Sequence, residues 1–364
     1  MRRFAVEERT MNMSDSGQSP VEERLAAVVE LLCSDPYLPR NTGARGAVEA
    51  ASYLASELES LGLEPAGEEG YLQEIPVING SNVLGSIPAR SDRWVVLAAH
   101  FDACGWENPG ANDNAAGVAV VLELARRLIS MEPEHSILIA LFDAEEPPNF
   151  LTPEMGSQWF VDHPSIPLDR IDTMVCLDLI GHALGPSVLP DSIRDSVFVL
   201  GAEKGSGTPR LFDSLPDVAG IVPRRVDNYI VPAMSDYHAF MNASIPFLFY
   251  TCGRNGDYHE PTDTPDKLDY PKMASLVDHL EMLVTALASR DDLPVYLRDA
   301  VDDAATVKTV SDMTEALSPF ASGASRVDSV VGSLKQRLSD KGALTDHDRR
   351  TIAYLIFSIE ESLA

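Results

Sequence analysis

One stretch of the chain, residues 94–117, constrains the fold more than any other part of the sequence. It opens with the apolar run WVVLAA, which has the length and composition of a strand buried on both faces of a sheet. His100 and Asp102 follow, and a loop containing glycine and proline leads to the cluster Asn-Asp-Asn at residues 112–114. Apolar residues then recur at helical spacing over 118–129, with Asn or Asp available as the N-cap. Polar groups at such strand-to-helix junctions are typical of ligand sites in open α/β sheets.

Two further apolar runs carry acidic residues at their carboxyl ends. Residues 136–142, SILIALF, lead into Glu145 and Glu146, and Asp178 lies near the end of the run at 173–179. An ionisable group in an apolar strand is costly unless it is paired or bound to a metal. Asp178 taken alone could equally be a carboxylate that caps a neighbouring turn.

The alternation of apolar strands with amphipathic helices predicts one α/β domain over residues 21–290. We expect a three-layer α/β/α sandwich with a mixed, mostly parallel central sheet. The expected helices are 21–32, 46–61 with Gly62 as C-cap, 236–241 and 273–288, and the expected strands include an antiparallel edge pair at 71–77 and 82–87, followed by 197–200 and 246–251.

The two ends of the chain differ from this pattern. Residues 1–20 are polar, and we expect a frayed tail there. Residues 291–364 contain no strand candidate and predict a helical C-terminal extension with helices at 294–317, 325–340 and 345–363. The last of these is amphipathic enough to dock on the main domain or on a second subunit, which would make the protein a homo-oligomer.

Composition bounds the functional classes. The net charge of −28 and the pI of about 4.5 argue against nucleic acid or an anionic membrane as partner. The four cysteines form no CxxC pair, which favours reduced thiols. The sequence also shows no signal-peptide pattern and no apolar stretch of membrane-spanning length, so we expect a cytoplasmic protein.

The polar residues at the strand ends form a set of nitrogen and oxygen donors. Such a set suits zinc and, less selectively, cobalt or manganese. Each residue alone has an ordinary structural explanation, but their arrival at successive strand ends favours a metal centre. If two ions lie ~3.5–4 Å apart, one carboxylate must bridge them. The set comprises His100, Asp102, Asp113, Glu145, Glu146, Asp178 and His259.

These residues lie in motifs through which the chain resembles the di-zinc aminopeptidases of the aminopeptidase Y type. Relatives of that family include glutamate-carboxypeptidase-like enzymes, glutaminyl cyclases and the metal-free transferrin-receptor ectodomain. The resemblance covers roughly residues 45–288. It departs at Pro147-Pro148, where the family more often has glycine, so it does not predict the shape of the pocket rim. The matching segments, in the family's order, are AAHFD, PGANDNAAG, FDAEE, GS, CLDLIG, SDYHAF and DYHEPTDTPDKLD.

The resemblance implies two zinc ions per chain and assigns five ligands. Asp113 would bridge the ions. His100 and Asp178 would complete one site, and Glu146 and His259 the other. No ligand position is missing from the sequence, which weighs against a receptor-like remnant.

The resemblance also implies roles for three residues that do not hold metal. Glu145 would be the general base that takes a proton from the metal-bridging water. Asp102 would accept the free N–H of His100 and fix its tautomer. Tyr258 matches a tyrosine that in some members donates to the developing oxyanion. The peptide bond that follows Asp113 is expected to be cis.

Several weaker candidates remain open. His238 is an alternative ligand to His259, and His182 is expected to be a loop residue rather than a ligand. Aromatic and aliphatic residues on the loops either line the substrate pocket or pack beneath those loops. These are Trp106, Phe150, Leu151 and Tyr229.

Three functions follow from these residues. The first is a metal-dependent aminopeptidase that releases N-terminal residues from peptides. The second is a glutaminyl-peptide cyclotransferase of the same fold, with which the DLIG sequence is compatible. The third is a catalytically idle interaction protein that uses its C-terminal helices for docking. Retention of Glu145 and of all five ligands favours the first.

Overall fold

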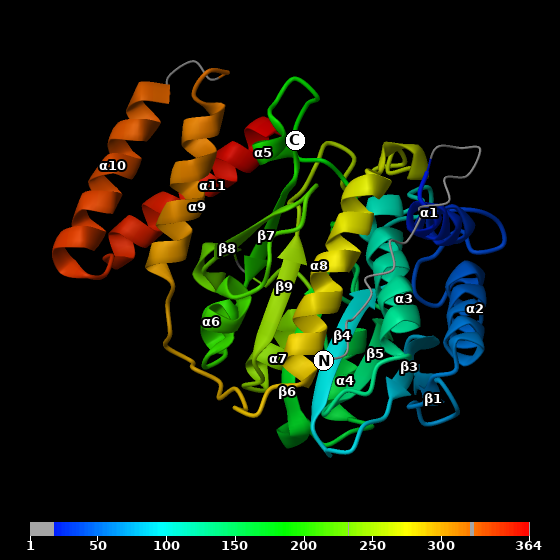
Figure 1. Cartoon of the computed structure of the whole chain (residues 1–364). Coiled ribbons are helices and arrows are strands. Elements are labelled where there is room, and N and C mark those ends of the chain that lie inside the picture. The colour runs from blue at the N-terminus through cyan, green and yellow to red at the C-terminus, as the bar shows by residue number, and fades with distance from the viewer. Residues whose placement is uncertain (1–17, 232, 321–323, 364) are drawn as a thin grey trace, which may run out of the picture.

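The computed structural model describes residues 18–231, 233–320 and 324–363, so the expected N-terminal tail lies almost entirely outside the described residues. The chain forms a three-layer α/β/α sandwich around one mixed sheet, as expected (Figure 1). The strands are β1 (Glu64–Pro65), β2 (Leu72–Ile75), β3 (Gly80–Ile87), β4 (Trp94–His100), β5 (Ser136–Phe142), β6 (Ile171–Leu177), β7 (Ser196–Leu200), β8 (Val222–Val226) and β9 (Phe247–Thr251).

The sheet order is β1-β3-β5-β4-β6-β9-β7-β8, with β2 also paired to β3. The four central neighbours β5, β4, β6 and β9 are parallel. Strands β2 and β3 form the expected antiparallel pair, and antiparallel pairing also joins β3 to β5 and β9 to β7. The carboxyl ends of the central strands therefore meet at one edge of the sheet, which is where the polar clusters follow.

Helices cover both faces of the sheet. Alternate residues of β4 divide the core: Val95, Leu97 and Ala99 pack on one face, and Val96 and Ala98 on the other. The first face is covered by α1 (Pro20–Leu32), α2 (Arg45–Leu61), α3 (Ala116–Leu128), α6 (Thr208–Asp213) and α8 (Tyr270–Ala288). The second face is covered by α4 (Gly156–Asp162), α7 (Tyr237–Asn242) and α9 (Asp303–Leu317).

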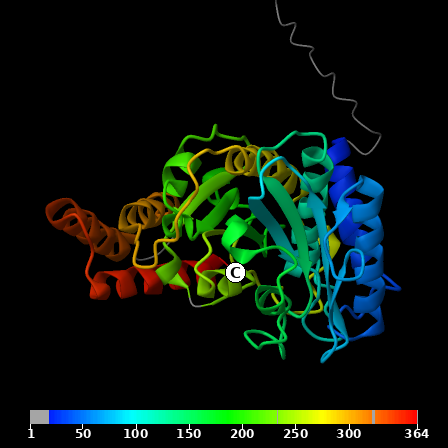
Figure 2. The same ribbon diagram turned by 90° about the horizontal axis from the view of Figure 1, so that it is seen from below.

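The helical extension continues from α9 through α10 (Ala324–Lys341) to α11 (Asp346–Leu363), while the short α5 (Asp191–Arg194) packs near α9. The extension lies at the end of the molecule opposite α1 and α2 (Figure 2). None of the helices within the described ranges is long and apolar enough to cross a membrane.

Local sequence signals explain several helix boundaries. Ser19 caps α1 by accepting from the N–H of Glu22, and Gly62 ends α2 in the left-handed conformation at φ 85°. Helix α8 begins three residues before the expected Met273, because Pro271 is tolerated in a first turn and Asp269 caps the helix.

The start of α9 and strand β8 are two of the places where the structure differs from expectation. The segment before α9 is not helical from residue 294. It runs as an extended connection whose Leu297 N–H donates to Lys204, and α9 begins only after Asp302 caps it. Strand β8 was not predicted, because its sequence VPRRV lacks an apolar run. It forms the edge of the sheet, where Pro223 removes no needed hydrogen bond.

Candidate metal centre

The carboxyl ends of four parallel strands bring the candidate ligands together. His100 is the last residue of β4, Glu146 follows β5, and Asp178 comes directly after β6. His259 lies on the loop that follows β9, and Asp113 lies in the turn before α3. Four of these side chains are buried, and that of His259 is 27% exposed. The structure thus gathers all five residues that the resemblance names.

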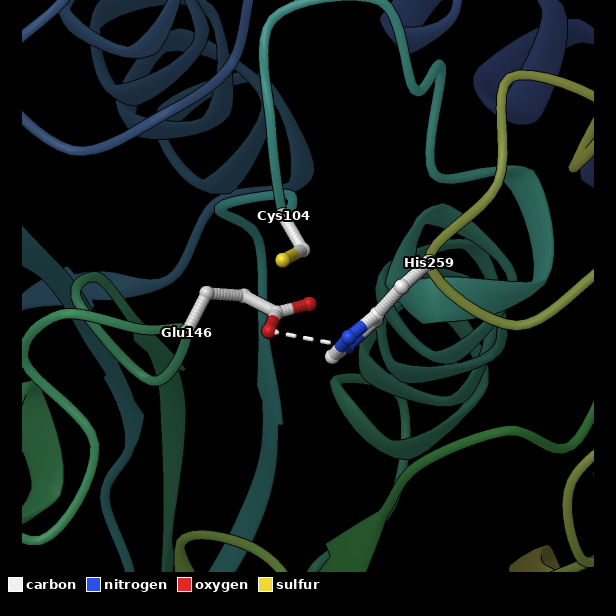
Figure 3. A group of neighbouring side chains, drawn as sticks. All are labelled: Cys104, Glu146 and His259. Carbon is white, nitrogen blue, oxygen red and sulfur yellow. Dashed lines mark ion pairs between the residues drawn. The ribbon is translucent and has the colours of Figure 1, made fainter.

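The five side chains form two groups that share Asp113. In one group, His100 Nε2 lies 3.3 Å from Asp113 Oδ1 and 3.5 Å from Asp178 Oδ1. In the other, His259 Nε2 lies 3.2 Å from Asp113 Oδ2 and 3.1 Å from Glu146 Oε2. Figure 3 draws the contact between His259 and Glu146. One carboxylate therefore presents an oxygen to each histidine, which is the arrangement that a bridging ligand needs.

Several atoms of this cluster are buried without a hydrogen-bond partner. They are His100 Nε2, Asp113 Oδ2, Glu146 Oε1 and Asp178 Oδ1. Buried polar atoms are normally satisfied, because leaving one unpaired is costly. Imidazole nitrogen and carboxylate oxygen are ligands of divalent transition metals. The residues present therefore fit a metal centre, with donors on both sides of Asp113.

The electrostatics of the cluster favour a cation. Burial raises the pKa of Glu145 well above its usual range, and burial next to Asp113 raises that of Glu146 to about 8. Burial alone would also raise the pKa of Asp113, but the imidazoles of His100 and His259 beside its two oxygens hold it below its usual range. Carboxylates crowded in this way repel one another, and a bound cation would offset that repulsion.

Asp102 joins the end of β4 to the segment that follows β5. Its carboxylate accepts the backbone N–H groups of Glu145 and Glu146 at 3.1 and 3.0 Å. The same carboxylate lies 3.3 Å from His100 Nδ1, on the side of the ring that faces away from Asp113 and Asp178. Asp102 is therefore placed to orient His100 and to fix the backbone on which both glutamates stand.

The turn that presents Asp113 is fixed by contacts that the sequence did not reveal. Asp263 accepts the N–H groups of Asn112 and Asp113 at 2.8 and 3.1 Å. Asn114 donates to the carbonyl of Leu177 and accepts from Gly117 N, and the Asp113–Asn114 peptide bond is cis, as expected. Asp263 stands inside the motif DYHEPTDTPDKLD, but nothing there indicates a partner 150 residues away.

A buried arginine fixes the loop between β4 and this turn. Arg40 is fully buried and donates to three carbonyl oxygens, those of Leu32 at 2.5 Å, Phe101 at 2.5 Å and Gly110 at 2.9 Å. The end of α1, the residue after β4 and the start of the Asp113 turn are thereby joined through one side chain. Sequence reasoning missed Arg40, because no motif surrounds it.

Two other polar residues near the cluster were not singled out. Asp236, from the SDYHAF motif, is buried with no hydrogen-bond partner at either oxygen, and burial raises its pKa to about 7. Cys104 points toward Glu146 and His259 (Figure 3). Burial and the nearby carboxylates raise the pKa of this thiol to about 11.

The weaker candidates separate in the structure. Within the described residues, neither His238 nor His182 belongs to a cluster of possible metal ligands. His182 is a buried loop residue beside Asn112, and burial lowers its pKa to about 3. Phe150 lines the pocket beside the cluster, and Tyr258 lines it with its ring stacked on His259 at 3.8 Å.

The other loop candidates do not line this pocket. Trp106 and Leu151 are 76% and 49% exposed, and Tyr229 packs beneath Arg349 of α11. Tyr229 therefore follows the packing alternative, whereas Trp106 and Leu151 are exposed and follow neither of the two.

Comparison with known proteins agrees with this geometry. The sequence profile described as peptidase family M28 matches residues 82–284. The uncharacterized protein YfbL of Escherichia coli is 30% identical over 235 residues, which cover 57% of this chain and 71% of that protein.

Two solved structures from Bacteroides thetaiotaomicron show the same fold at 20% identity and a TM-score of 0.56. One is a leucine aminopeptidase precursor, matched over 74% of this chain and 97% of that chain. The other is a glutaminyl cyclase bound to N-acetylhistamine, matched over 74% of this chain and 98% of that chain. The matched profile spans more than half of the chain and contains all five clustered residues, and the chain therefore belongs to peptidase family M28.

Proposed function

We propose that the protein is a zinc-dependent aminopeptidase that holds two metal ions per chain. The observation that carries the proposal is the position of Asp113, whose two oxygens face His100 and His259 at 3.3 and 3.2 Å. Asp178 would complete the site of His100, and Glu146 the site of His259. When bound, the zinc ions would lower the pKa of a water molecule and polarise the carbonyl of the scissile bond.

Glu145 is the group that would move the proton. Its carboxylate lies 3.9 Å from His100 Nε2 and stands next to Glu146, so it reaches the cluster without being needed as a ligand. Burial raises its pKa well above its usual range, which suits a base that must also return the proton to the leaving amine. The hydroxyl of Tyr258 would donate a hydrogen bond to the oxyanion, and Asp102 would keep His100 oriented.

The charges of the pocket favour the amino end of a peptide over its carboxyl end. The metal-binding end of the pocket presents four carboxylates, Asp113, Glu145, Glu146 and Asp178. Among the described lining residues Arg254 is the only Lys or Arg, and it is paired with Glu360 at 2.9 Å. A free substrate carboxylate would therefore find no unpaired arginine or lysine there, whereas an ammonium would meet Glu145, the one of the four carboxylates that is not assigned to a zinc ion.

The cyclase alternative is supported by the glutaminyl cyclase structure, which matches as closely as the aminopeptidase structure. The composition of the rest of the pocket argues against the cyclase alternative. Beyond the acidic end the lining is largely apolar, which suits an apolar side chain better than the carboxamide of glutamine.

A substrate panel separates the candidate functions. Aminoacyl-anilides and a peptide with N-terminal glutamine are incubated with the protein, with and without chelator. An aminopeptidase releases the aniline and the free amino acid from the anilides and free glutamine from the peptide, and the chelator abolishes both reactions. A cyclase releases ammonia from the glutamine peptide and leaves the anilides intact. No turnover of either substrate in zinc-loaded protein would leave the interaction-protein alternative.

A further inference from the structure

A single pocket joins the metal-binding residues to the C-terminal helices. Its volume is about 360 Å³, within the range of small-ligand sites. At one end lie Asp113, Glu145 and Glu146, and at the other lie side chains of α9 and α11. The helices lie outside the segment that matches the peptidase family, yet they complete the cavity that begins at its metal centre.

The wall that the two helices supply is apolar. Apart from Glu360, it consists of Val310 and Met313 from α9, and Ala353, Ile356, Phe357, Ile359 and Leu363 from α11. Phe198, Phe249 and Met234 of the main domain also line this pocket. A substrate group that enters this part of the pocket exchanges water for hydrocarbon contacts, which is favourable only for an apolar group.

An ion pair fastens α11 to the loop that carries His259. The guanidinium of Arg254 donates to both carboxylate oxygens of Glu360, at 3.2 and 2.9 Å, and the backbone N–H of Arg254 also donates to this carboxylate at 2.8 Å. The guanidinium lies 5.4 Å from the centre of the Phe357 ring. The pair thus neutralises the two charges at this end of the pocket and fixes the wall beside the metal-binding loop.

Helix α9 is fastened to the sheet as well. Thr306 Oγ1 accepts the N–H of Asp227 at 2.9 Å, and Thr309 donates to the carbonyl of Arg225 at 2.9 Å. Arg349 of α11 donates to both oxygens of Asp303 at the start of α9, at 2.9 and 3.0 Å. The two helices are therefore held both to the sheet and to each other. Helix α10 projects outward (Figure 1), and none of its described residues lines the pocket.

We propose that α9 and α11 form the wall of the pocket that receives the side chain of the substrate's N-terminal residue, and that they select large apolar side chains. This inference rests on the proposed aminopeptidase function. It assigns a substrate class to the site and gives the C-terminal extension a role in specificity. One missing methylene in an apolar pocket changes kcat/KM by ~10–200-fold. The zinc-loaded protein is accordingly expected to cleave leucyl and phenylalanyl anilides at least ~10-fold better than alanyl anilide.

The test replaces Ile356 by Gln and measures kcat/KM for leucyl, phenylalanyl and alanyl anilides. A polar group in the wall is expected to lower the leucyl-to-alanyl ratio of kcat/KM by ~10-fold or more, while the metal content stays at the wild-type value. Tyr354→Gln is the matched control, because Tyr354 is on the same helix, is 72% exposed and does not line the pocket. The leucyl-to-alanyl ratio of kcat/KM in this control is expected to match that of the wild type.

A second variant tests the same wall at its exposed rim. Phe357 lines the pocket and is 45% exposed, so Phe357→Gln alters the wall with little effect on the core, and the same fall in the ratio is expected. A wild-type protein that cleaves anilides without preferring apolar residues would overturn the inference and leave the proposed function standing. Unchanged ratios in both wall variants would also overturn it. A zinc-loaded wild type that cleaves no anilide would remove the proposed function, and the inference with it.

Discussion

The two halves of the pocket are built in different ways. The metal-binding half contains the proposed ligands, which lie at or after the carboxyl ends of neighbouring strands, and several of its buried polar atoms have no hydrogen-bond partner. The apolar half draws its wall from helices beyond residue 302, and its two charged groups, Arg254 and Glu360, satisfy each other. One half is arranged to receive charge and the other to exclude it. Changes to the first should therefore affect chemistry and metal binding, and changes to the second should affect selectivity.

The largest effect is expected from removing a ligand in the metal-binding half. His259→Ala leaves Glu146 and Asp113 without their shared imidazole, so the protein should lose metal and activity together. His238→Ala is the matched control, since His238 lies outside the clusters of the described residues and its loss should leave the metal content intact. Metal analysis of both purified variants checks this, and equal loss in the two would overturn the ligand assignment.

The next effect separates two adjacent glutamates. Glu145→Gln should keep both metals and lower kcat by ~10²–10⁴, the usual contribution of a general base, with a much smaller change in KM. Glu146→Gln should instead weaken or empty one metal site. Steady-state kinetics with metal analysis distinguishes them, and the acidic limb of the pH–rate profile should change in Glu145→Gln. Near-normal turnover by a fully metallated Glu145→Gln protein would exclude Glu145 as the base.

A smaller effect is expected from the residue that orients His100. Asp102→Asn removes the carboxylate 3.3 Å from His100 Nδ1 and should weaken metal binding by ~10–100-fold. Asp172→Asn is a matched control, because Asp172 is a buried carboxylate 2.8 Å from His135 at a distance from the cluster. Competition with a chelator of known affinity measures both. A similar loss in the two variants would point to a general effect of removing a buried charge.

The smallest effect is expected where the helical extension joins the sheet, and it is an effect on folding stability rather than on catalysis. Burial, with Asp227 nearby, raises the pKa of Glu203 to about 7 from its usual value of 4.5. The folded state thus holds this proton more tightly than the unfolded state, so the stabilisation is complete below pH 4.5 and is lost as the pH rises through 7.

Glu203→Gln removes this titration, so it tests the shift directly. Relative to the variant, the unfolding free energy of the wild type should fall over this pH window by at most about 3 kcal/mol. Denaturant unfolding at pH 5, 6, 7 and 8 checks the trend. A constant difference between the two proteins across that window would contradict it.

The metal-binding half could be predicted because its information is local. His100, Glu146 and Asp178 each stand at or just after an apolar strand, so a short sequence window shows both the strand and the polar end. Parallel order then brings those ends together. Asp113 and His259 were candidate donors as well, but only the resemblance assigned their roles as ligands, since the loop position of His259 carries no periodic signal.

The apolar half could not be predicted because its contacts join distant parts of the chain. Arg254 meets Glu360 across 106 residues, and nothing near either residue indicates the other. The start of α9 was placed too early, because the hydrogen bond from the Leu297 N–H to the Lys204 carbonyl holds the preceding segment extended. Strand β8 was missed because an edge position, unlike a central one, permits Pro223 and two arginines.

The three hydrogen bonds of Arg40 bear on how the site meets its substrate. They join the end of α1, the residue after β4 and Gly110, so the loop before Asp113 is positioned by the fold itself. The entropy lost in ordering that loop is incurred during folding rather than on encounter with a ligand. Binding then requires little rearrangement at Asp113, and the affinity of the site for metal and substrate is not reduced by a disordered resting state.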